Sequence, residues 1–196
     1  MSNEKFLQLR EKYPSFSYNG WQLTRENDEI KIAFDFSIDG LCDFHPSTRI
    51  PVKELNIAND YNSEIAEKIV FNLGMVELIS YWKCACPKIV NVKCGYLSEK
   101  DIKWYKKLYF GGLSEFFYIN GIETDEESFM EIQVNEELEH HIHTQAYNSN
   151  GINLIPVGGG KDSCVTASLL KDFKNKNMFF TVNDQKARTD TVLAAG

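Results

Sequence analysis

Hydrophobic and polar residues alternate with a period of two from Ile30 to Ile38. Such alternation is typical of a strand with one buried face. The pair Asp39-Gly40 follows and favours a tight hairpin turn, so a return strand is expected to end at Pro46. The aromatic residues within 16–21 indicate an earlier strand. The chain therefore begins with a predicted antiparallel sheet.

From Ser63 onward the apolar residues recur at helical spacing. The stripe with this spacing consists of Ile65, Ile69, Leu73 and Val76. Further apolar residues widen the stripe, and a helix that is apolar over most of its circumference is expected to be buried. Pro87 ends the segment, and 89–92 predicts a short strand. Ser98 and Asp101 then predict the capping box of a second helix.

The second half of the chain begins with an acidic segment and a predicted linker. Glu123 to Glu139 is strongly acidic and is interpreted as a solvated face. Turn-forming residues at 148–151 predict a linker. After it come a short apolar run at 154–157, a glycine run, a helix with Val165, Leu169 and Phe173 four residues apart, and a buried strand at 178–182. This order predicts the start of a parallel sheet.

The predicted fold class is therefore α/β, with two domains. Residues 1–147 form an α+β unit, and residues 148–196 form the start of a Rossmann-like parallel α/β domain. From Gly151 to Gly196 there are only 46 residues, whereas doubly wound sheets use about five strands. We expect the chain to be a truncated frame, a fragment or one part of a split enzyme. Its partner would be the missing C-terminal half or a second copy.

Composition narrows the classes of function. The chain has 196 residues, 43% of them hydrophobic and 25% charged, as in globular proteins. A net charge of -7 argues against a nucleic-acid partner. No apolar stretch reaches the roughly 18 residues of a membrane span, so no membrane is expected. The first residues lack a secretory signal, and five cysteines without one suggest reduced thiols in a cytoplasmic protein.

The glycine run carries the clearest chemistry. It comprises Gly158, Gly159, Gly160, Lys161, Asp162 and Ser163. Glycines let the backbone approach a ligand closely, and the free N–H groups at a helix start favour an anion. Lys161 adds a positive charge and Ser163 a hydroxyl. A carboxylate from Asp162 beside phosphates suits a shared Mg²⁺. The loop is therefore predicted to bind ATP or pyrophosphate with Mg²⁺, and Asp162 is the candidate metal ligand.

The run resembles the PP-loop of the ATP pyrophosphatases, written Ser-Gly-Gly-x-Asp-Ser. Gly158 stands here in place of the first serine, which removes one hydroxyl and leaves the backbone cradle. The spacing does not fit the P-loop of the common NTPases. The resemblance implies cleavage of ATP between the α and β phosphates with transfer of AMP to an oxygen.

A wider resemblance covers most of the chain. The stretches that carry it are 79–83 (Ile-Ser-Tyr-Trp-Lys), 107–109 (Lys-Leu-Tyr), 112–116 (Gly-Leu-Ser-Glu-Phe) and 157–163. They are similar to those of the UDP-N-acetylmuramoyl-L-alanyl-L-glutamate epimerases of peptidoglycan biosynthesis, on which the bacterial cell wall and cell shape depend. The resemblance implies an isomerase that adenylates the terminal glutamate, which acidifies its α-proton, and yields D-glutamate, AMP and pyrophosphate. Another PP-loop enzyme and a non-catalytic nucleotide-binding remnant remain alternatives.

The proton-transfer residues are not fixed by any pattern. Cys84 and Cys86 are candidates, because a pair of thiols suits proton removal on one face and return on the other. Lys83 is a candidate for binding the peptide's carboxylates. The same cysteines with Cys94 and the histidines at 140, 141 and 143 allow a zinc site, although the Cys-x-Cys spacing is unusual for one. Buried cysteines are more often small hydrophobic residues.

Overall fold

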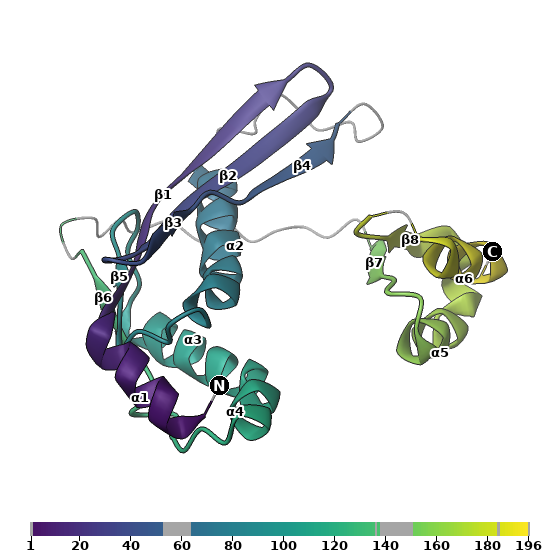
Figure 1. The fold of residues 1–196 in the computed structure, drawn as a ribbon. Helices are drawn as coiled ribbons and strands as arrows, with labels where there is room; N and C mark the ends of the chain where they lie inside the picture. Colours follow the sequence, from purple (N-terminus) through teal and green to yellow (C-terminus); the bar gives the residue numbers. More distant parts are fainter. Residues whose placement is uncertain (1, 53–63, 136, 138–150, 184, 196) are drawn as a thin grey trace. The chain divides into compact units, whose positions relative to one another are not determined.

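The computed structural model describes residues 2–52, 64–135, 137, 151–183 and 185–195. The chain divides into two compact units, Met1–Ile142 and His143–Gly196 (Figure 1). The first unit contains α1 (Asn3–Lys12), β1 (Ser15–Glu26), β2 (Glu29–Ile38), β3 (Cys42–Phe44), β4 (Ser47–Pro51), α2 (Glu64–Trp82), β5 (Ile89–Val92), α3 (Glu99–Gly112), α4 (Ser114–Asn120) and β6 (Glu131–Val134). The second contains β7 (Asn153–Pro156), α5 (Lys161–Leu169), the 3-10 helix η2 (Lys171–Lys176), β8 (Asn177–Phe180) and α6 (Lys186–Ala195). The predicted mixed α/β class is confirmed.

A mixed sheet organises the first unit. Its strands follow the order β3-β2-β1-β5-β6, and β4 also pairs with β2. The predicted hairpin is present, since β2 pairs antiparallel with β3 from Ile38 to Phe36 after a turn at Asp39-Gly40. On the other side β1 pairs in parallel with β5, and β5 with β6. The pairing of β1 with β2 shifts between Tyr18 and Gly20, which marks a β-bulge.

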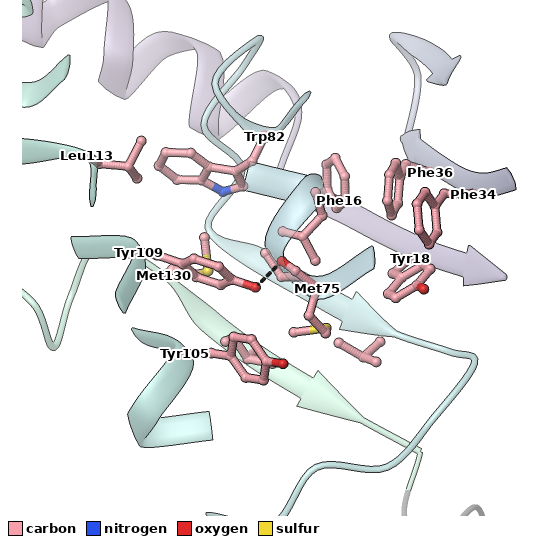
Figure 2. Packing of buried hydrophobic residues seen from close by; sticks show 14 of the residues in the cluster. Phe16, Tyr18, Phe34, Phe36, Met75, Trp82, Tyr105, Tyr109, Leu113 and Met130 are labelled. Atoms are coloured by element: carbon pink, nitrogen blue, oxygen red, sulfur yellow. Dashed lines mark hydrogen bonds between the residues drawn. The ribbon is translucent and has the colours of Figure 1, made fainter. Parts of the chain in front are cut away.

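Helices cover one face of this sheet, and the core lies between them and the strands. Phe16, Tyr18, Phe34 and Phe36 of β1 and β2 belong to this core (Figure 2). Tyr18 stacks on Phe71 of α2, and Phe36 contacts the ring of Tyr81 on the same helix. The hydroxyl of Tyr109 on α3 donates to the backbone oxygen of Met75 on α2. The capping box of Ser98 and Asp101 is confirmed at the start of α3.

The expectation for α2 was wrong in one respect. The stripe of Ile65, Ile69, Leu73 and Val76 is exposed, with Ile69 at 62%. The helix buries the opposite side instead, through Val70, Phe71, Gly74, Met75, Leu78 and Trp82. Both sides of the helix are apolar, so the spacing alone did not say which side meets the sheet. Gly74 and Phe71, which pack against Tyr18, determine which side of the helix meets the sheet.

The acidic segment is not only a solvated face. Within its described part, Phe129, Met130 and Ile132 are buried, and residues 131–134 form β6 at the edge of the sheet. In β6 the polar Glu131 and Gln133 alternate with Ile132 and Val134, as in a strand with one buried face. The net charge of the segment does not reveal this alternation. Residues 148–150 of the predicted linker at 148–151 lie outside the described residues.

The second unit is a strand–helix–strand–helix segment. Its two strands, β7 and β8, pair in parallel with Leu154 opposite Met178 and Pro156 opposite Phe180. Ile155 is buried, but Met178 and Phe180 are each 50% exposed, so the expectation of a buried second strand was wrong. The residues at 165, 169 and 173 are also exposed, and residue 173 belongs to η2 rather than α5. Parallel sheets normally have both faces covered, and this one has an uncovered apolar face within the described residues.

Candidate functional site

The glycine run lies where the two parallel strands of the second unit end. It connects β7 to α5, and the N–H of Val157 donates to the oxygen of Phe180 at 2.8 Å, which ties the start of the loop to the end of β8. Ligands of open α/β sheets bind outside the carboxyl ends of the strands. The topology therefore places the loop at the edge where such a sheet binds its ligand.

The loop has the backbone geometry of an anion cradle. Gly159 has a φ of 79°, a left-handed conformation that favours glycine. Gly160 is extended and begins α5 without any side-chain cap, so the first N–H groups of this helix lack a capping partner. The side chains of Lys161 and Asp162 are exposed beside them. These groups suit an anionic ligand.

Ser163 has a structural role that its place in the motif did not reveal. Its Oγ accepts a hydrogen bond from the N–H of Gly158 at 3.0 Å. The hydroxyl thus holds the start of the loop closed over the first turn of α5. Its own hydrogen remains available for donation to a ligand oxygen.

Arg188 of α6 is a residue at this site that the sequence reasoning missed. Its guanidinium donates to the backbone oxygens of Gly158 at 3.5 Å and Asn183 at 3.3 Å, and also to that of Val182. A Cβ built on Gly159 would lie 3.1 Å from the backbone nitrogen of Arg188, so α6 packs directly against the loop. One feature of the sequence could have pointed to Arg188: the segments that follow two parallel strands meet at the same edge of the sheet.

The donor set fits a nucleotide phosphate with Mg²⁺. The loop offers backbone N–H groups, the ammonium of Lys161 and the carboxylate of Asp162. No group of three metal-ligating side chains occurs among the described residues. A Mg²⁺ ion here would hence take most of its oxygen ligands from phosphate and water, with Asp162 as the protein ligand, as Mg²⁺ commonly does.

Lys83, Cys84 and Cys86 lie in the turn that follows α2, in the first unit. The side chains of Lys83 and Cys84 are exposed. The pKa of Cys84 is nevertheless raised, mainly because its thiol is partly desolvated and to a smaller extent because Cys42 lies nearby. Cys86 is fully buried with a φ of 52°, its thiol donates to the oxygen of Lys83, and burial raises its pKa to about 12. Burial and protonation both weigh against Cys86 as a base. A role for Lys83 or Cys84 stays a prediction.

The zinc alternative gains no support from the described residues. Cys94 is half-buried, and burial raises its pKa to about 12. Zinc needs thiolates. The cysteines form no group of three ligands with other described residues. The three histidines of the alternative lie outside the described residues.

Alkylation should separate the five cysteines. We expect iodoacetamide at pH 8 to modify the exposed Cys42, Cys84 and Cys164 well before Cys86, because only an accessible thiolate reacts. Mass spectrometry of the alkylated peptides, with a urea-unfolded sample as control, measures this order. Modification of Cys86 at the rate of Cys164 in the folded protein would contradict its burial.

One comparison with known proteins identifies the family. A family model described as the MurL N-terminal domain matches residues 8–196, which span both units. The chain belongs to the MurL N-terminal domain family. No curated protein and no solved structure matches the chain. This match supports the epimerase family that the sequence patterns resemble.

The family match spans the glycine loop as well as the sheet of the first unit. Among the described residues of this MurL chain, no helix is both long and apolar enough to cross a bilayer.

Proposed function

We propose that this MurL chain is the N-terminal part of an ATP-dependent epimerase that converts the terminal L-glutamate of UDP-N-acetylmuramoyl-L-alanyl-L-glutamate to D-glutamate. The observation that supports it most is a glycine loop with PP-loop character at the carboxyl ends of two parallel strands, in a chain of the MurL family. ATP would supply the AMP that neutralises the α-carboxylate, so that the neighbouring C–H becomes acidic enough for a base to remove its proton.

The residues of the loop would bind and orient the phosphates. The N–H groups at the start of α5 point toward the anion, and Lys161 offsets its charge. Asp162 would share Mg²⁺ with phosphate oxygens. Arg188 would keep the loop and the end of β8 in register through the backbone oxygens that it binds. Water would be excluded poorly here, because Lys161 and Asp162 are exposed.

The exposed surface of the second unit limits what the chain does alone. The outer face of β7 and β8 displays Leu154, Met178 and Phe180, each at least half exposed. We propose that helices of a further segment or a second copy cover this face in the active enzyme, since parallel sheets are covered on both faces. The 196-residue chain is expected to bind ATP weakly and not to turn over.

The assay is incubation with UDP-N-acetylmuramoyl-L-alanyl-L-glutamate, ATP and Mg²⁺, with measurement of AMP and of glutamate chirality. We expect the complete enzyme to release AMP and form D-glutamate together. AMP release with glutamate remaining in the L form would favour a different PP-loop reaction and contradict the epimerase proposal. Turnover by the 196-residue chain would show that its uncovered sheet needs no partner.

A further inference from the structure

The open face of the sheet in the first unit carries polar residues that the proposed nucleotide site does not use. Phe16 and Tyr18 point into the core (Figure 2), and side chains alternate along a strand, so Ser17 faces the opposite side. The strand register places Ser37 of β2 and Asn91 of β5 on either side of Ser17. Three neighbouring strands thus present hydroxyl and amide groups side by side.

Hydrogen bonds join these groups into one row. The ammonium of Lys93 donates to Oδ1 of Asn19 at 3.1 Å. The Asn19 amide nitrogen donates in turn to Oγ of Ser37 at 3.0 Å and to Oδ1 of Asp35 at 3.5 Å. Nδ1 of His45 lies 3.6 Å from the same Asp35 oxygen. These bonds join Asn19, Asp35, Ser37 and Lys93, with a cation on one side of Asn19 and a carboxylate on the other. The polar row is defined as these four residues together with Ser17, which lies beside Ser37 in the strand register without being bonded to it.

A β-bulge shapes this row. The register between β1 and β2 shifts at Asn19, which leaves this residue without a ladder partner, and Gly20 lies opposite Asp35. A Cβ built on Gly20 would meet no atom within 4 Å, so space remains beside the Asp35 carboxylate. The N–H of Lys93 donates to the oxygen of Tyr18 at 3.0 Å, at the point where the parallel strands β1 and β5 separate. Bulges often aim a side chain at a functional site.

One group in the row lacks a partner. Ser17 is 1% exposed, and its Oγ has no hydrogen-bond partner among the described residues. An unpartnered buried hydroxyl costs about 1–3 kcal/mol. Because Ser17 is covered, a ligand atom reaches its hydroxyl only where the polar side chains around it move aside. Such a ligand atom would give the hydroxyl the partner that it lacks.

We propose that the polar row binds the carboxylate-bearing end of a peptide. A carboxylate pairs with the Lys93 ammonium, which keeps two donors beyond its bond to Asn19. The peptide N–H groups donate to Asp35, beside the open space at Gly20. This inference rests on the proposed function, whose substrate ends in a glutamyl residue, and it assigns that peptide end to the first unit.

The test uses the dipeptide L-alanyl-L-glutamate as the probe, titrated into the 196-residue chain by calorimetry. We expect Lys93→Gln to weaken its binding by about tenfold or more, as for loss of a charged hydrogen bond. Lys88→Gln is the matched control, since Lys88 is exposed and directly precedes β5, whereas Lys93 directly follows it. The fully amidated dipeptide should not bind. Equal binding by wild type and Lys93→Gln, or equal binding of the amidated probe, would overturn the proposal.

Ser17→Ala separates a binding role from a structural one. Removing an unpartnered buried hydroxyl should raise the thermal midpoint, while the affinity for the dipeptide falls. Unchanged affinity in a stabilised variant would exclude Ser17 from the site. ATP titration of the same samples keeps the two proposals distinct. If the chain binds ATP but not the dipeptide, only the proposal for the polar row is contradicted. If it binds the dipeptide but not ATP, only the proposed nucleotide site is contradicted.

Discussion

Gly159→Val is expected to abolish ATP binding by this MurL chain while the first unit stays folded. The φ of 79° at Gly159 is a region that a β-branched residue occupies only with strain. A Cβ there would also lie 3.1 Å from the backbone of Ala187 and Arg188, so the loop would be pushed away from α6. We expect an affinity loss of about a hundredfold or more, equivalent to roughly 3 kcal/mol. Calorimetric titration with ATP, with and without Mg²⁺, measures it.

Gly158→Ser is the matched control in the same loop. Gly158 is not among the glycines with positive φ, and a Cβ built there comes no closer than 4.0 Å to Oγ of Ser163. Serine is also the residue that the PP-loop motif has at this place. We expect Gly158→Ser to bind ATP at least as well as the wild type. Equal loss in both variants would mean that general disturbance of the loop, and not the conformation of Gly159, accounts for the effect.

Gly74→Ala is expected to destabilise the first unit strongly. A Cβ at Gly74 would lie 2.5 Å from Cζ of Tyr18 and 2.9 Å from Cε1 of Phe34. The Tyr18 ring has little room to move, because it stacks on Phe71 with the ring planes 6° apart. Overpacking of this kind costs about 1–3 kcal/mol and sometimes more. Urea unfolding followed by fluorescence measures the change in the free energy of unfolding.

Gly111→Ala, in another helix of the same unit, is expected to stabilise the protein. A Cβ at Gly111 on α3 would meet no atom within 4 Å. Replacing a helical glycine by alanine then stabilises by about 0.5–1 kcal/mol, because less chain entropy is lost on folding. A destabilisation by Gly111→Ala as large as that by Gly74→Ala would contradict the packing described for Tyr18.

The sheet of the first unit was largely predictable, because alternation in β2 and the capping box of α3 are local signals. The buried side of α2 was not predictable in the same way. Apolar residues lie on both sides of this helix. The deciding contact, between Gly74 and Tyr18, joins residues 56 positions apart in sequence. The strand at 131–134 was hidden for a similar reason, since its place beside β5 depends on a distant partner.

The glycine loop was predictable as a motif, whereas its surroundings were not. Consecutive glycines before a helix predict a local backbone conformation without any distant contact, and the positive φ of Gly159 is an example. Arg188 reaches the loop only because β7 and β8 pair in parallel, a long-range contact that no spacing encodes. The row around Asn19 depends likewise on a bulge and on three strands that meet in space.

The most direct test of the nucleotide site is titration of isotope-labelled protein with ATP and Mg²⁺, followed by nuclear magnetic resonance of the backbone amides. The account predicts that the largest shifts occur at residues 158–163, that they require Mg²⁺, and that Gly159→Val removes them. A well-folded sample in which saturating ATP leaves these amides unshifted, or shifts only amides of the first unit, would contradict it.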